Sequence, residues 1–265
     1  MYRLLRANLS RVINSKLFWA LCVVMAGIAV AFITGTAAYN ERSSVDGIVV
    51  NGFGMFTGIA VALFSSIFFG TEYGDGTIRN KLIVGHGRTA IYLTNLLTAV
   101  ICAFGFAAAY FLPVVVIGFP VLGLPTVASA KIIGVGSATL IAFCSVHTMV
   151  SMVYANKAGA TVVNLLIAFV TLVAAYGICM MLYQPEFVHA FGLGDEVIEL
   201  PNRYYVSGAS RALLVMLVDL MPAGHVIQSM IDPVSPLWAL PLCSAGVCVA
   251  CAAIGVVVFH GKNIK

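Results

Sequence analysis

Few residues of this sequence carry side chains that could do chemistry, and they are densest between residues 70 and 88, where the chain reads GTEYGDGTIRNKLIVGHGR. Apolar runs flank this short charged stretch on both sides. Thr77 suits the N-cap of a helix and Gly85 its C-terminal stop. The stretch therefore predicts a helix of about two turns, from 78 to 84. This helix would present three polar residues to a soluble partner: Arg79, Asn80 and Lys81.

No catalytic motif is recognisable elsewhere in the chain. The nearest approach to a phosphate-binding loop runs from Gly255 to Asn263, but its two glycines are one residue too far apart. Asparagine also follows Lys262 where the Walker pattern has serine or threonine. The motifs HExxH and GxSxG are absent, and no pair of carboxylates lies inside an apolar run. We therefore expect no catalytic residue, no metal site and no bound cofactor.

The composition places most of this chain in lipid. Hydrophobic residues make up 61% of it and charged residues 9%, and the mean hydropathy is +1.03, whereas soluble domains contain about 25% charged residues. The net charge of +4 comes from basic residues at the edges of apolar runs, so it does not indicate a nucleic-acid partner. The seven cysteines lie in apolar stretches and are expected to be small core residues.

The apolar runs predict a single membrane domain, residues 1–265, of the all-α class with six transmembrane helices. We expect the spans at residues 17–38, 52–69, 90–122, 132–154, 159–183 and 237–259. Residues 1–16 mix basic and apolar side chains and predict an amphipathic helix in the membrane interface. The run that follows is too long for a signal peptide, so it is expected to remain as the first span. Pro113 and Pro120 predict a kink or break late in the third span.

The basic residues predict how the spans are oriented. With a cytoplasmic N-terminus, ten of the 14 lysines and arginines fall in inner segments. Eight of the ten acidic residues then fall outside, all but Glu72 and Asp75. By the positive-inside rule, both termini are expected in the cytoplasm.

Residues 184–236 form the one sizeable external segment of this arrangement. Within it, the apolar run 212–220 is too short to cross a bilayer. It predicts an external or re-entrant helix before the last span. The remainder, with Asp195, Glu196 and Glu199, is expected to be a solvated loop.

Three polar side chains deep in the predicted spans, Asn95, His147 and Asn164, could contact a substrate or relay protons. No charged side chain accompanies them at that depth, so hydrogen bonding between helices is the preferred interpretation. Gly54 and Gly58 form a GxxxG pair, which lets another helix approach closely. That helix would belong to this chain or to a second subunit.

The stretch between 70 and 88 resembles the inner-loop signature of type-2 ABC transporter permeases. The resemblance is carried by the residues Glu72, Tyr73, Gly76, Thr77, Ile78, Arg79, Asn80, Lys81, Gly85 and Arg88. It implies that the loop holds a coupling helix, which docks into a separate cytosolic ATPase. The residues from Glu72 to Lys81 that match the signature would then transmit ATP-driven closure to the spans.

The layout of the whole chain is similar to that of small bacterial half-permeases, including those of bacitracin-resistance and lantibiotic-immunity exporters. The resemblance implies a multi-pass subunit of the bacterial cytoplasmic membrane that is not itself an enzyme, with ATP and Mg²⁺ bound by the partner ATPase. It also implies a dimer with a second permease chain, identical or homologous, surrounded by membrane lipid. The exported substrate would be a peptide, a drug-like molecule or a lipid-like molecule.

Two other classes compete with this interpretation. A secondary transporter or channel would need no ATPase, but such proteins usually show intramembrane charges or inverted repeats. An intramembrane enzyme would need a catalytic constellation, and the sequence contains no recognisable one.

Overall fold

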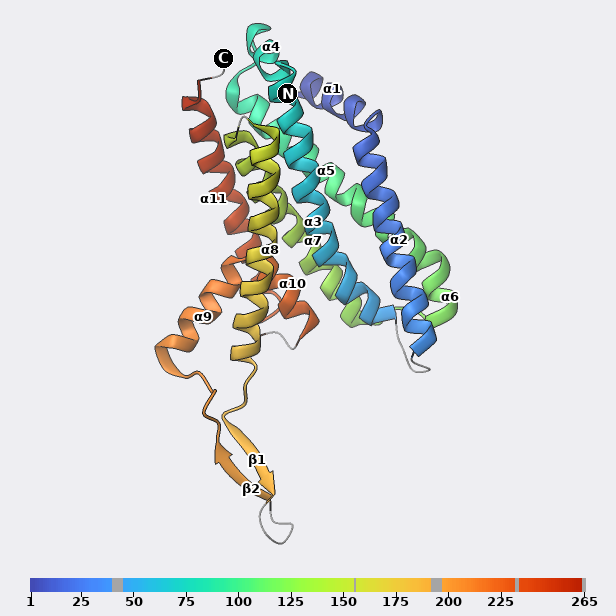
Figure 1. Ribbon diagram of the computed structural model, residues 1–265, viewed down its shortest axis with the longest axis vertical. Coiled ribbons are helices and arrows are strands. Elements are labelled where there is room, and N and C mark those ends of the chain that lie inside the picture. Colours follow the sequence, from blue (N-terminus) through green and yellow to red (C-terminus); the bar gives the residue numbers. More distant parts are fainter. Residues whose placement is uncertain (40–44, 155, 192–196, 232–233, 264–265) are drawn as a thin grey trace.

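The computed structural model describes all residues except 40–44, 155, 192–196, 232–233 and 264–265. Within the described part, six helices are long and apolar enough to cross a membrane, and they lie side by side as a bundle (Figure 1). Their bounds are α2 (Lys16–Tyr39), α3 (Val45–Gly74), α5 (Arg88–Pro113) with its continuation, α7 (Val127–Val153), α8 (Lys157–Leu182) and α11 (Ala239–Gly261). The architecture is that of a multi-pass α-helical membrane protein, which confirms the six predicted spans.

The third span contains the irregularity that its prolines predict. α5 ends at Pro113, and a π-helical segment, η1 (Val114–Gly118), leads into α6 (Phe119–Leu122). Pro113 cannot donate a backbone hydrogen bond, and a π-helical turn is one way for the chain to continue past such a point. Gly123 then ends the helix with a φ of 89°.

α3 is the central helix of the bundle and packs against α2, α5, α7 and α8. It begins seven residues before the predicted span and ends five residues after it, because no proline or cap interrupts the helical chain there.

Close packing between helices of the bundle depends on a glycine opposite a tyrosine at two points. A Cβ atom on Gly52 would lie 1.7 Å from the hydroxyl of Tyr110, and one on Gly255 would lie 2.0 Å from that of Tyr92.

The two ends of the bundle carry different elements. At one end, α1 (Tyr2–Ile13) lies across the spans near α4 (Thr77–Ile83), and α11 ends at the same end of the bundle, on the side away from α1 (Figure 1). At the opposite end lie α9 (Gly208–Leu220) and α10 (Pro222–Met230). These two helices are bent by 105° at Met221 and form an elbow. The predicted run 212–220 is therefore the last part of α9, and it ends at this bend.

A β-hairpin projects from the bundle beyond this elbow (Figure 1). It pairs β1 (Phe187–Phe191) with β2 (Val197–Pro201) in antiparallel register, with Phe187 opposite Pro201. The sequence did not predict these strands, but the side chain of Glu199 is exposed, as expected of a solvated segment. Asp195 and Glu196, placed in the same loop by that expectation, lie outside the described residues.

Candidate functional site

The short helix α4 is held by glycines at both of its ends. Gly76 precedes it with a left-handed φ of 65°, so the N-cap is Gly76 and not the expected Thr77. At the other end, Gly85 has a φ of 94° and takes the predicted stop position. The amide of Gly85 bonds to the carbonyl of Leu82 at 2.9 Å, and the amide of His86 bonds to that of Lys81 at 3.1 Å. These two bonds form a Schellman motif, which satisfies the last carbonyls of the helix.

The Glu72 carboxylate lies directly beside this helix and is completely buried. It accepts hydrogen bonds from the Arg11 guanidinium on α1 and from Lys81 Nζ on α4, the latter at 2.7 Å. Asn95 Nδ2 on α5 donates to its second oxygen at 3.1 Å. A buried carboxylate is costly unless it is paired and its remaining acceptor positions are filled. Two cations and an amide meet both conditions here.

Asn8 extends this network to α1. Its Nδ2 donates to Asn95 Oδ1 at 2.8 Å and to Thr98 Oγ1 at 3.2 Å, while its Oδ1 accepts from Lys81 Nζ at 3.0 Å. The Glu72 cluster consists of Asn8, Arg11, Glu72, Lys81, Asn95 and Thr98. It joins α1, α3, α4 and α5 at one end of the bundle.

Three members of the Glu72 cluster were not singled out by the sequence analysis: Asn8 and Arg11 on α1, and Thr98 on α5. Leu4, Asn8 and Val12 form the buried line of α1, spaced four residues apart. An asparagine in the middle of an otherwise apolar helical stripe is therefore the signal that marks this face.

The outer side of α4 differs from what the sequence predicts in one residue. Arg79 and Asn80 are exposed, as expected, but Lys81 turns inward and only 11% of its side chain is exposed. Ile78 is buried and anchors the helix. The most exposed apolar residues are Ile83 and Val84, at 73% and 76%. The free face of α4 is thus one arginine and one asparagine beside two apolar side chains.

Tyr73, next to Glu72, fastens α3 to the end of α7. Its hydroxyl donates to the carbonyl of Met152 at 2.5 Å, and Lys262 Nζ lies 4.2 Å from the centre of its ring. Lys262 Nζ also donates to the carbonyls of Met152 and Val153, at 3.0 and 2.7 Å. Burial lowers the pKa of Lys262 to about 8.

Arg88, the last residue of the predicted signature, begins α5 and caps the end of α11. Its guanidinium donates to the carbonyls of Phe259 and His260, both at 3.0 Å, and to that of Lys262. A cation at the C-terminus of a helix is stabilised by the helix dipole and satisfies free carbonyls. The ends of α3, α5, α7 and α11 are therefore tied together around the Glu72 cluster.

The polar residues predicted deep in the spans all bond between helices. Asn95 belongs to the Glu72 cluster, whereas His147 and Asn164 lie apart from it, where His147 Nδ1 meets Asn164 Oδ1 at 3.0 Å between α7 and α8. Asn164 Nδ2 also donates to Ser151 Oγ at 2.8 Å. This is the hydrogen bonding that commonly holds membrane helices together.

The two glycines of the GxxxG pair face other helices of this same chain. A Cβ atom on Gly54 would lie 2.7 Å from Val226 on α10, and one on Gly58 would lie 3.2 Å from Phe143 on α7. Both positions therefore serve close packing within the bundle.

The elbow holds a second polar cluster that the sequence analysis did not predict. The Asp219 carboxylate accepts from Gln228 Nε2 at 2.8 Å and from Ser235 Oγ at 2.6 Å. His225 Nε2 lies 2.7 Å from the backbone carbonyl of Asp219, and its Nδ1 lies 2.9 Å from Ser244 Oγ. We call this group the Asp219 cluster: Asp219, His225, Gln228, Ser235 and Ser244. Its only sequence signal is the number of polar residues within a predominantly apolar region.

The cysteines offer no further site in the part of the chain that the structure describes. All seven are free thiols, and Cys248 and Cys251 are spaced Cys-x-x-Cys on α11. No group of three or more histidine, cysteine, aspartate or glutamate residues among the described residues is arranged to hold a metal ion.

Comparison with known protein families finds no matching family, and comparison with curated proteins finds no match.

Proposed function

We propose that this chain is the membrane-spanning permease subunit of an ATP-driven exporter, and that α4 is the coupling helix that docks into a separate cytosolic ATPase. The observation that carries the proposal is the attachment of α4. It lies outside the spans, yet Lys81 and Glu72 fasten it to α1, α3 and α5 through the Glu72 cluster. A push on such a helix is passed to three other elements.

The free face of α4 supports docking. Arg79 supplies a charge, and Ile83 and Val84 supply exposed apolar area next to it. Interfaces depend on a few such side chains surrounded by nearly neutral contacts. The roles of the other matched residues differ, because Glu72, Tyr73 and Lys81 are occupied within the chain and would transmit the movement instead of making the contact.

The proposed placement in the bacterial cytoplasmic membrane follows the charges. The end with α1 and α4 carries most of the basic residues, so we place it and both termini in the cytoplasm. α1 is then the interfacial helix, and the α9–α10 elbow is a re-entrant element at the outer side. ATP and Mg²⁺ belong to the ATPase, and a second permease chain, identical or homologous, completes the path for a peptide, drug-like or lipid-like substrate, as in antimicrobial-peptide resistance.

The docking helix is tested by reversing its exposed charge. The tagged chain is purified from its native membrane, and copurifying ATPase and ATP hydrolysis are measured for the unmodified chain, for Arg79→Glu and for Val84→Asp. Both changes should reduce ATPase recovery while leaving the amount of folded permease unchanged. The matched control is Lys157→Glu, an exposed charge at the same end of the bundle. Lys81→Glu is unsuitable, because it would set a second carboxylate against Glu72.

Two outcomes would overturn the proposal. If no ATPase copurified with the unmodified chain, a secondary transporter or channel would become the favoured function. If ATPase recovery were equal for all three variants, α4 would not be the helix that contacts the ATPase.

The placement of the elbow is tested by labelling. Single cysteines replacing the exposed Ser210 and Trp238 should both react from outside the cell if α9 and α10 turn back. Reaction from opposite sides of the membrane would make the bent pair a seventh span.

A further inference from the structure

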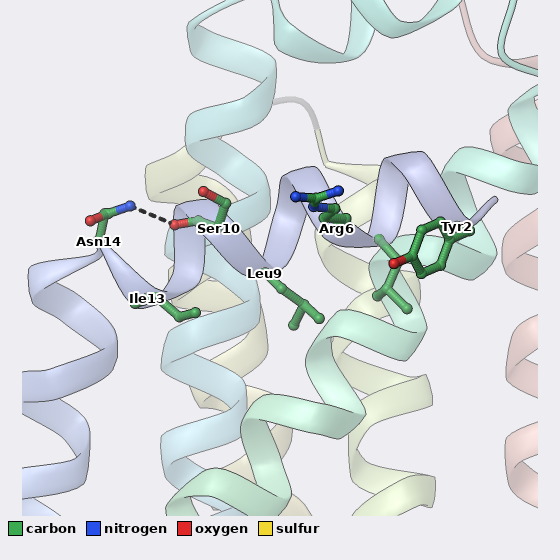
Figure 2. Close-up of a pocket in the computed structure, with 7 residues that line it drawn as sticks. Tyr2, Arg6, Leu9, Ser10, Ile13 and Asn14 are labelled. Carbon is green, nitrogen blue, oxygen red and sulfur yellow. Dashed lines mark hydrogen bonds between the residues drawn. The ribbon is translucent and has the colours of Figure 1, made fainter.

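The face of α1 that turns away from the bundle contains a hollow of about 370 Å³. Figure 2 shows Leu9 and Ile13 extending from the lower edge of α1, while Ser10 and Asn14 lie at its upper edge. Arg6 lies between these two sets. The hollow therefore combines an apolar side with a cationic and hydrogen-bonding side.

The corner between α1 and α2 fixes the level of this hollow relative to the membrane. The indole Nε1 of Trp19, in the first turn of α2, donates to the carbonyl of Ile13 at the end of α1, at 2.8 Å. α2 is one of the six spans, so α1 lies at the level where a span leaves the hydrocarbon. Tryptophan and tyrosine favour that level, and Tyr2 and Trp19 are both exposed there, at 76% and 55%.

The charge of this region is one-sided. The first 40 residues contain no aspartate or glutamate. Arg11 is paired with Glu72, but Arg6 forms no hydrogen bond or ion pair with another described residue. Arg3 and Lys16 are also exposed, and neither forms an ion pair within the described part of the chain. The geometry of a guanidinium matches that of a phosphate group. The Arg6 guanidinium lies beside apolar side chains that are left exposed by the rest of the chain.

From this geometry we infer that the hollow on α1 binds an anionic phospholipid, with the phosphate on Arg6 and Ser10 and an acyl chain against Leu9 and Ile13. The level of α1 favours a lipid over a soluble anion, because Ile13 is 62% exposed at the start of a span. The unbalanced positive charge favours a lipid of net negative charge over a zwitterionic one. This inference needs only the membrane character of the chain and does not depend on an ATPase.

The test is lipid binding to the purified full-length chain in detergent, followed by native mass spectrometry. Phosphatidylglycerol should bind more tightly than phosphatidylcholine of the same chain length. Arg6→Gln should weaken phosphatidylglycerol binding about fivefold, the effect of roughly one basic residue near an anionic surface. Ile13→Ser should weaken both lipids, because it removes contact with the acyl chain. Since both residues are exposed, neither change should alter the melting temperature.

The matched control is Arg79→Gln, which removes an exposed arginine from α4 at the same end of the bundle. It should leave phosphatidylglycerol binding unchanged. The inference fails if Arg6→Gln binds phosphatidylglycerol as tightly as the unmodified chain does, or if Arg79→Gln weakens that binding as much as Arg6→Gln does. It also fails if the unmodified chain binds phosphatidylcholine as tightly as phosphatidylglycerol.

Discussion

The bundle has a buried polar cluster at each end, and the two are built differently. At the end with α4, Glu72 is completely buried and is paired with two cations, Arg11 and Lys81. At the elbow, Asp219 is partly exposed and accepts from the neutral side chains of Gln228 and Ser235. Burial therefore sets the partners that a carboxylate needs, since a fully buried carboxylate requires opposite charge and a partly hydrated one does not.

The two clusters also differ in what they hold together. Arg11 and Glu72 are 61 residues apart, so their contact fixes how distant helices meet. The partners of the Asp219 carboxylate lie only nine and 16 residues from it, so they mainly hold the local elbow. Damage to the first cluster should therefore loosen one whole end of the bundle, and damage to the second should affect mainly α9 and α10.

The largest expected effect is that of Glu72→Gln. The change leaves Arg11 and Lys81 without their shared counter-charge, and Lys81 is too buried to be rescued by water. We expect a loss of about 3 kcal/mol in the free energy of unfolding, typical of breaking a buried ion pair. Reversible denaturant unfolding in mixed micelles measures it.

The matched change at the other end is Asp219→Asn, which keeps the shape and removes the charge. Because the partners there are neutral and the group is partly exposed, the expected loss is about 1 kcal/mol. Equal losses at the two ends would show that charge compensation does not distinguish the clusters.

A second effect tests whether steric fit, rather than charge, sets the elbow. A Cβ atom on Gly224 would lie 2.0 Å from the backbone carbonyl oxygen of Val218, which cannot move aside as a side chain can. Gly224→Ala should therefore open the bend between α9 and α10 and lower the free energy of unfolding by about 2 kcal/mol. The same unfolding assay measures the loss, and proteolysis should become faster between 208 and 230.

Gly177→Ala on α8 is the control for this substitution, because nothing lies within 4 Å of a Cβ atom there. Alanine should be tolerated or slightly stabilising at that helical position. If Gly224→Ala were equally harmless, the elbow would not depend on the close approach of the two helices.

Those features of the fold that depend on local pattern could be predicted from the sequence. The six spans follow from apolar run length, and the stop of α4 follows from Gly85 in its left-handed conformation. The inward turn of Lys81 could not be predicted, because it depends on where the carboxylate of Glu72 lies on a different helix. The roles of Asn8 and Arg11 could not be predicted for the same reason, because their partners are in α3, α4 and α5.

The opposite end was harder to predict for a geometric reason. A bend of 105° between α9 and α10 brings His225 and Gln228 back to Asp219, and no periodicity in the sequence records that bend. The hairpin formed by β1 and β2 lies beyond the bundle, so its strands lack the strict alternation that burial of one sheet face imposes. Polar contacts made through tertiary structure are thus the part that the sequence leaves open.

The smallest expected effect concerns a cation at the same end as Glu72 that has no carboxylate partner. Lys262 donates to the carbonyls of Met152 and Val153 and lies over the ring of Tyr73, and no acidic side chain of the described residues pairs with it. Burial lowers its pKa from 10.5 to about 8, because the charged form loses hydration without gaining a counter-charge.

The sign of the resulting pH dependence follows from proton binding. Between about pH 8 and 10.5 the unfolded chain holds a proton on Lys262 that the folded chain has released. The contribution of Lys262 to the free energy of unfolding therefore increases as the pH rises through that window. Acetylation of Lys262 in the folded protein, followed by mass spectrometry of the peptide that contains it, should reach half its maximal rate near pH 8. The same peptide free in solution should do so near 10.5. If the folded protein and the free peptide gave the same pH profile, the Lys262 ammonium would be fully hydrated in the folded protein. Lys262 would then not be an uncompensated buried charge, and its contrast with Lys81, which is buried against a carboxylate, would be lost.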